Sequence, residues 1–242
     1  MNRKELLNKF YVTKEYNSLK KILANGQTSY EKYYLAKIYA QEKDYKTASL
    51  IYKSINQYYE YGRCELLQGN FDNAKKIWHD IKEDSPPVMW GRSLLEFINL
   101  YVINVPTFFQ IRAFLEVDLD ALLNAGLINY CENIVNGAHL LAQNNQESYK
   151  FIGRVFVNNE YFDLGELFLK RAKDICYVDP EVHFLLAKCH LHNNDKKEAK
   201  KALKTSIEKG YGYYPAKKLL DTRWGVRGVH SSAGQLGGRS CS

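Results

Sequence analysis

Four basic residues recur at matching places along the chain, each directly after a small residue. They are Lys37, Arg63, Arg154 and Lys188. An aromatic or basic residue stands four positions before each of them, at Tyr33, Tyr59, Lys150 and Phe184. On a helix this spacing puts both groups on one face, and such a lining favours a peptide that carries acidic groups and apolar anchors. Long cationic side chains that only solvate a helix give the same pattern, so both interpretations stay open.

The small residues before these cations indicate the elements that position them. Pairs of Gly or Ala twelve residues apart occur at Ala36 and Ala48, Gly62 and Ala74, Gly153 and Gly165, and Ala187 and Ala199. Two antiparallel helices whose axes cross at about 8–10 Å have room only for small side chains at the crossing. The sequence therefore predicts helical hairpins with one cation beside each crossing.

An offset of 34 residues separates Gly153 from Ala187. This offset is typical of the tetratricopeptide repeat, and the chain resembles that family over about two thirds of its length. The resemblance implies an all-α fold, a tetratricopeptide-repeat superhelix of stacked helix-turn-helix hairpins with an irregular helical middle. The first helix of each hairpin would line the concave surface, which makes the four cations candidates for a peptide groove.

The pattern predicts a single domain over residues 1–221. Its units are a degenerate hairpin at 1–26, repeats at 29–55 and 55–88, irregular helices at 88–143, and repeats at 146–179 and 180–213. Residues 222–242 hold Gly, Arg and Ser without an apolar period and are interpreted as a disordered or vector-derived tail.

Local signals mark several helix ends. Asp179 before Pro180 is an N-cap and first-turn pair, Asp195 with Glu198 forms a capping pattern, and Gly210 is a typical stop. The crossings at Ala48 and Ala74 lie only 26 residues apart. We therefore expect short helices in that part of the chain.

The middle segment has helical periodicity but no twelve-residue pairs. One helix is predicted from Trp90 to Tyr101 and a second long helical segment from Leu119 to Leu141, with Pro106 dividing them. The apolar residues around Pro106 are more than one helix face can hide. They are either the core of eroded repeats or a surface for self-association.

The charge balance gives little support to a nucleic-acid partner. The net charge is +7, but residues 222–242 contribute three Arg and no acid, which leaves +4 for residues 1–221. The densest basic run is Lys196, Lys197, Lys200, Lys201 and Lys204, with Asp195 and Glu198 among it. This run is interpreted as a solvated helix face, and no nucleic-acid-binding motif accompanies it.

No set of residues predicts catalysis or a metal site. The five cysteines are odd in number and never form a Cys-x-x-Cys pair, which indicates a reducing compartment. Cys189, His190 and His192 have no second ligand pair. The longest apolar stretch, 94–111, is interrupted by polar residues and Pro106, so no membrane span is expected. We expect a non-enzymatic protein without cofactors, in the nucleus, the cytoplasm or both.

Three short phrases carry a narrower resemblance. They are Tyr34-Leu35-Ala36-Lys37, Tyr61-Gly62-Arg63-Cys64, and Leu185-Leu186-Ala187-Lys188-Cys189. In these phrases and in its irregular insert, the chain resembles the amino-terminal part of the scaffold subunits of the anaphase-promoting complex, or cyclosome. The resemblance implies a homodimer formed through amino-terminal repeats and a non-catalytic place among other subunits of a ubiquitin ligase in cell-cycle control.

Candidates for self-association come from the amino-terminal hairpin and the apolar middle. They are Leu6, Phe10, Tyr11, Phe97, Tyr101, Phe108 and Phe109. The alternative is a generic tetratricopeptide adaptor or co-chaperone that binds an acidic peptide in its concave groove. A chaperone clamp needs polar or charged residues where Tyr33 and Tyr59 stand, which disfavours the co-chaperone form of this alternative.

Overall fold

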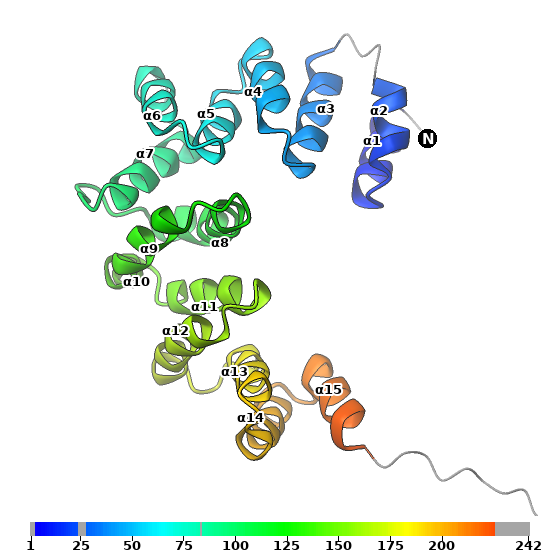
Figure 1. The fold of residues 1–242 in the computed structure, drawn as a ribbon, viewed down its shortest axis with the longest axis vertical. Coiled ribbons are helices and arrows are strands. Elements are labelled where there is room, and N and C mark those ends of the chain that lie inside the picture. The colour runs from blue at the N-terminus through cyan, green and yellow to red at the C-terminus, as the bar shows by residue number, and fades with distance from the viewer. Residues whose placement is uncertain (1–2, 24–27, 83, 226–242) are drawn as a thin grey trace, which may run out of the picture. The chain divides into compact units, whose positions relative to one another are not determined.

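The computed structural model describes residues 3–23, 28–82 and 84–225, and this part of the chain consists of helices, turns and connecting loops (Figure 1). Its contacts divide the chain into two units, Met1–Ile175 and Cys176–Ser242, which we call unit 1 and unit 2. The sequence predicts one domain over 1–221, and whether the two units act as one domain stays a prediction. No helix among the described residues is both long and apolar enough for a membrane span.

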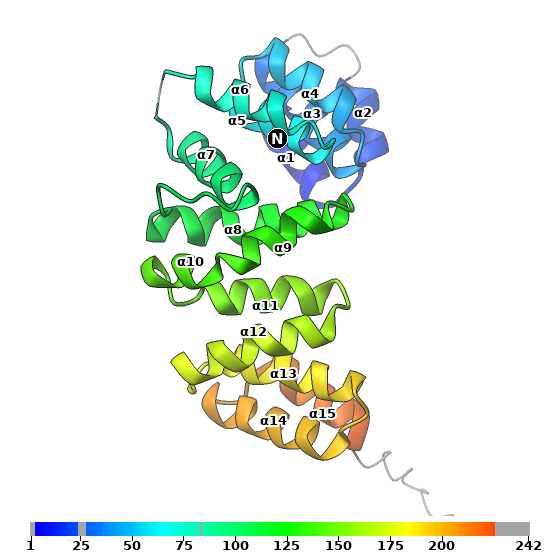
Figure 2. The same ribbon diagram turned by 60° about the vertical axis from the view of Figure 1, so that its left-hand side comes forward.

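Unit 1 holds α1 to α12. Their bounds are α1 Arg3–Val12, α2 Tyr16–Leu23, α3 Ser29–Gln41, α4 Tyr45–Ser54, α5 Tyr58–Leu67, α6 Phe71–Asp80, α7 Pro86–Ile98, α8 Phe108–Asn124, α9 Ile128–Asn136, α10 Ala138–Asn144, α11 Ser148–Asn158 and α12 Phe162–Ile175. The pairs α3/α4, α5/α6 and α11/α12 pack as neighbours, and α8 packs against α7, α9 and α11 (Figure 2).

Unit 2 holds three helices among its described residues. They are α13 Pro180–His192, α14 Lys196–Lys209 and α15 Tyr214–Trp224. Ala187, Leu203 and Ala216, one from each helix, form its buried core. Helix α15 was not predicted, and it includes three residues that the sequence assigned to the tail. Residues 226–242, the rest of the predicted tail, lie outside the described residues.

The close crossing predicted at Gly153 and Gly165 is present between α11 and α12. A Cβ atom added to Gly153 would lie 3.2 Å from the carbonyl oxygen of Gly165, and one added to Gly165 would lie 3.2 Å from the oxygen of Gly153. A larger residue at either position would separate the two helices. The twelve-residue spacing of these two glycines therefore results from close backbone contact between α11 and α12.

The crossing at Gly62 differs from this pattern because a tryptophan fills the space. The indole of Trp78 on α6 lies between Gly62 on α5 and Gly91 on α7, and a Cβ on either glycine would come within 2.8 Å of a ring atom. Trp78 is fully buried and donates its Nε1 hydrogen to the carbonyl oxygen of Tyr59 at 3.2 Å. This ring joins α5, α6 and α7.

Helices α4, α5 and α6 are ten residues each, as the short repeat spacing predicts. The predicted helix ends in unit 2 are also confirmed: Asp179 and Asp195 cap α13 and α14, and Gly210 follows the last residue of α14.

The prediction of one long helical segment from Leu119 to Leu141 is wrong. Helix α8 ends at Asn124, and Gly126, with φ of +78°, turns the chain into α9. Gly137 then separates α9 from α10. The apolar period continues across these breaks because each short helix buries an apolar face of its own. The sequence pattern therefore does not reveal that Gly126 supplies a left-handed turn between α8 and α9.

Candidate functional site

A cleft of about 580 Å³ opens in unit 1 between the α3–α5 hairpins and helices α8 and α11. Its walls combine carboxylates, amides, cations and short apolar side chains. The lining residues are Ala40, Gln41, Lys43, Tyr45, Arg63, Leu67, Glu116, Val117, Asp120, Ala121, Asn124, Val155 and Asn158. A volume in the range of about 300–1,000 Å³ is usual for ligand sites.

Helix α8 forms the floor of this cleft, and its sequence explains its position. Thr107 and Gln110 form a reciprocal capping box at its start, in which each side chain accepts a hydrogen bond from the other's backbone N–H. Ile111, Leu115 and Leu119 bury one face of the helix. The opposite face, with Val117, Asp120 and Asn124 at helical spacing, is left to line the cleft.

Asp118 fixes α8 against α5 and α7. Its side chain is 3% exposed, and Oδ2 accepts hydrogen bonds from Tyr59 Oη at 2.9 Å and Trp90 Nε1 at 2.7 Å. Arg63 Nε donates to Oδ1, and Arg63 also reaches the carbonyl oxygen of Val117 at 3.3 Å. A buried carboxylate needs partners of this number and charge. The cluster therefore holds one wall of the cleft in place.

The cluster also shifts the pKa values of its members. Burial, followed by the negative charge of Asp118, raises the pKa of Tyr59 well above its ordinary value. Burial alone would lower the pKa of Arg63, but the charge of Asp118, the hydrogen bond to it and the neighbouring groups together outweigh burial, and the pKa is raised. Tyr59 thus stays a neutral donor and Arg63 stays charged, which keeps the hydrogen bonds to Asp118 intact.

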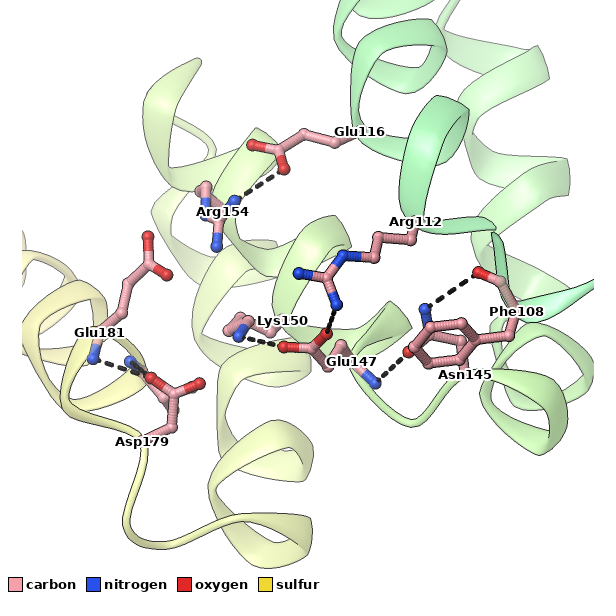
Figure 3. Close-up of polar contacts among 10 residues, drawn as sticks. Phe108, Arg112, Glu116, Asn145, Glu147, Lys150, Arg154, Asp179 and Glu181 are labelled. Atoms are coloured by element: carbon pink, nitrogen blue, oxygen red, sulfur yellow. Dashed lines mark hydrogen bonds and ion pairs between the residues drawn. The ribbon is translucent and has the colours of Figure 1, made fainter. Parts of the chain in front are cut away.

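A second set of acid–base pairs joins α8 to α11 (Figure 3). Figure 3 shows Arg154 directed at Glu116, at 2.7 Å. Asn159, directly after α11, donates to Asp120 at 2.7 Å. Figure 3 also shows Arg112 of α8 and Lys150 of α11 directed at Glu147, at 3.9 Å and 2.6 Å. The carboxylates of α8 therefore contact the hairpins on both sides of this helix.

Lys43 also lines the cleft. It lies in the α3–α4 turn with φ of +64°, and its Nζ donates to the carbonyl oxygen of Asn124 at 3.0 Å. Asn124 is the last residue of α8. A cation at this end of a helix stabilises carbonyl groups that have no partner within the helix.

The predicted groove residues of α5 and α11 have partners within unit 1. Tyr59 and Arg63 do not present free groups to an open groove, because both are bound to Asp118. Arg154 lies beside Glu116 and Lys150 beside Glu147. The cationic lining is thus largely neutralised within the molecule, and the direct role of these residues in peptide binding stays a prediction.

The predicted groove residues of α3 belong to an aromatic cluster. Lys37 Nζ lies 4.4 Å from the ring centre of Tyr11 and 5.6 Å from that of Tyr33. Tyr33 Oη donates to Glu60 at 3.4 Å, and burial, followed by the charge of Glu60, raises its pKa to about 12. Within unit 2, Phe184 packs edge-on against Tyr213 with ring centres 5.9 Å apart, and Lys188 is partly buried.

The candidates for self-association fall into four groups. Phe97 is a correction: it is 2% exposed, and its ring lies against Gly137. Tyr101 and Phe109 are 71% and 79% exposed, and Phe108 is 40% exposed. Tyr11 is partly buried against Tyr16 and Tyr34. The side chains of Leu6 and Phe10 lie outside the described residues.

Sequence reasoning missed the acids of α8. Glu116, Asp118 and Asp120 alternate with Val117 and Leu119 in a segment that was interpreted only by its apolar period. Three acids at every second position on a helix cannot share one face, since positions two apart lie on nearly opposite sides. That pattern was the available signal that α8 is bound on more than one side. Among the described residues, no cluster of three or more His, Cys, Asp or Glu is arranged for a metal ion.

No protein-family model matches the chain. No curated protein matches it either. Among solved structures it is similar to YrrB, described as a TPR protein with an unusual peptide-binding site, at 11% sequence identity and a TM-score of 0.36, over 83% of this chain and 96% of that one. A structural similarity this weak gives no information about function. The tetratricopeptide-like fold rests on the chain's own geometry, which is antiparallel helix pairs with small residues at their crossings.

Proposed function

We propose that the chain is a non-catalytic adaptor that binds an extended segment of a partner protein in the cleft of unit 1. The observation that supports this function is the composition of the cleft walls. Gln41 and Asn158 offer amide donors and acceptors, Asn124 offers an amide oxygen, and Val117, which is 58% exposed, offers apolar contact. An extended peptide matches such a surface because its backbone bonds to the amides and its alternate side chains reach the apolar walls.

The pairing of charges changes the peptide that we expect. Arg63 and Arg154 are matched by Asp118 and Glu116, so the cleft has no excess of free cations for a strongly acidic peptide. A segment with polar side chains of both signs fits better, since it can bond to Asp120 and approach Lys43, which both line the cleft.

The test compares the partners captured by the full chain and by two matched variants. Val117→Arg places a long cation in the cleft, and Leu50→Arg makes the same change on α4 away from it. The two residues are 58% and 62% exposed, so neither substitution buries a charge. Tagged proteins are captured from the cells of origin and the partners are identified by mass spectrometry.

We expect a defined set of proteins to be lost with Val117→Arg and retained with Leu50→Arg. Peptides from those proteins should then bind the unmodified chain directly. An identical set with all three proteins would rule out the cleft as the binding site.

A narrower form of the proposal is a subunit of the anaphase-promoting complex, most like the subunit called cell-division-cycle twenty-seven. It is supported by the three sequence phrases alone, since no curated protein matches. This form includes a nuclear or cytoplasmic location and other cyclosome subunits as partners. Their presence among the captured proteins would support it, and a set without any of them would contradict it.

Homodimer formation belongs to the same narrower form, which places it in the amino-terminal repeats, and the exposed apolar loop of the middle segment is a second candidate surface. The exposed residues Leu100, Tyr101 and Ile103 form the surface that a second copy would cover, and Glu96 holds this loop by accepting from the N–H of Ile103 at 2.8 Å and of Asn104 at 2.9 Å. If a dimer forms here, Tyr101→Glu should convert it to a monomer in light scattering. A monomeric unmodified chain at high concentration would contradict it.

A further inference from the structure

The long basic run of the sequence lies on one exposed surface of α14. Lys196, Lys200 and Lys204 follow at intervals of four residues, with Lys197 and Lys201 beside them, and all five are exposed. The other face of the helix is buried through Ala199, Leu203 and Ser206. The hydroxyl of Ser206 donates a hydrogen bond to the carbonyl oxygen of Pro180 at 2.6 Å. The lysines therefore stand on a helix with a fixed orientation within unit 2.

These lysines have little internal compensation. Within the described part of unit 2, the one ion pair of this helix joins Lys201 to Glu198 at 3.6 Å, with side chains 75% and 42% exposed. The described residues of unit 2 carry ten Lys and Arg against six Asp and Glu, a net charge of +4. Unit 1 carries 22 against 21 over more than three times that length, so the excess charge is a local property.

The position of the lysines does not serve the stability of α14. Lys196 and Lys197 lie in the first turn, next to the positive end of the helix dipole, where a cation is unfavourable. Asp195 and Glu198 offset part of this effect at the same end. Cations that destabilise a helix start and do not stabilise the fold elsewhere are expected at a functional surface.

We propose that the exposed lysines of α14 bind an acidic polypeptide segment, independently of the cleft in unit 1. Ammonium groups one helical turn apart repeat at about 5.4–6 Å. Alternate side chains of an extended peptide repeat at about 6.6 Å, so glutamates or aspartates at every second position lie opposite successive lysines. The charge and the spacing of the surface match this partner.

Other anionic partners fit the surface less well. Helix α14 has no aromatic residue on which a base could stack. A membrane-bound helix needs bulky apolar residues beside its cations, and the apolar residues of α14 face the interior of unit 2.

The experiment measures binding of a fluorescein-labelled peptide of alternating Glu and Ser to the full chain by fluorescence polarisation. The test variant is Lys196→Gln with Lys200→Gln and Lys204→Gln. The matched control replaces three exposed lysines of unit 1, Lys46, Lys75 and Lys76, by Gln, which changes the net charge equally. Glutamine keeps helix propensity close to that of lysine, and thermal unfolding checks that both variants are folded.

We expect the test variant to bind the peptide about tenfold more weakly, because each exposed charge pair contributes a factor of about two. The control should bind like the unmodified chain, and peptide-induced NMR shifts should be confined to α14. Absence of binding, or equal weakening in both variants, would overturn the proposal. Tighter binding of oligouridine RNA, or of vesicles of phosphatidylcholine and phosphatidylserine, than of the peptide would also overturn it.

Discussion

Arg63 of unit 1 and Lys200 of unit 2 are both cations on a hairpin helix, yet the structure treats them differently. Arg63 lies against the buried carboxylate of Asp118 and is 24% exposed at its side chain. Lys200 is exposed, and no carboxylate among the described residues forms an ion pair with it. The sequence presents both in the same way, as basic residues at helical spacing.

The difference comes from α8. In unit 1 this helix packs against α11 and α7 and supplies acids to both sides, so the cations of neighbouring helices find partners inside the molecule. In unit 2, α14 packs against α13 and α15, and its five lysines stay exposed. A basic residue on a repeat is thus available to a partner only where no acid of a neighbouring helix pairs with it.

Removal of Asp118 should produce the largest effect. Asp118→Ala removes the buried carboxylate that pairs with the partly buried Arg63 and accepts from Tyr59 and Trp90, so the free energy of unfolding of unit 1 should fall by about 3–5 kcal/mol. Chemical unfolding followed by circular dichroism measures it. The control Asp174→Asn alters an exposed acid of α12 and should stay within about 0.5 kcal/mol. Equal effects in the two variants would mean that the buried cluster contributes no special stability.

The second largest effect should come from alkaline pH, which should lower the free energy of unfolding of unit 1. Burial, followed by the charge of Glu60, raises the pKa of Tyr33 from 10.0 to about 12. A group whose pKa is raised on folding contributes stability that is complete below the unfolded pKa and is lost as pH rises to the folded value. The free energy of unfolding should therefore fall between pH 10 and about 12. Tyr33→Phe should reduce this fall, and an unchanged pH profile in that variant would contradict the assignment.

Coupling energies should distinguish the ion pairs by their burial. Double-mutant cycles on Arg154 with Glu116, whose side chains are 22% and 34% exposed, should give about 0.5–1 kcal/mol. The same cycle on Lys201 with Glu198, at 75% and 42% exposed, should give a value close to zero. A larger coupling energy for Lys201 with Glu198 than for Arg154 with Glu116 would contradict the difference that we infer between the two units.

The smallest effect on stability should come from the lysines of α14. Replacing Lys196, Lys200 and Lys204 by Gln removes repulsion near the helix start, so the melting temperature of the chain should be unchanged or slightly higher. A clear decrease in melting temperature would show that these lysines stabilise the fold and would remove the contrast with Asp118.

The sequence by itself determined the local features of this protein. The hairpin at Gly153 and Gly165, the caps at Asp179 and Asp195, and the short helices before Trp78 follow from residues close to one another in the chain. Backbone clearance and capping depend on neighbours within one or two turns, so the pattern suffices to predict them.

Only the tertiary structure decided which cations are available to a partner. Asp118 meets Arg63 across 55 residues of sequence, and Glu116 meets Arg154 across 38. The breaks at Gly126 and Gly137 set the direction of α8 to α10, and the continuous apolar period did not reveal them. Whether two charges come together depends on the packing of helices that are remote in sequence. A helical period fixes the face on which a charge stands but not the residue opposite it.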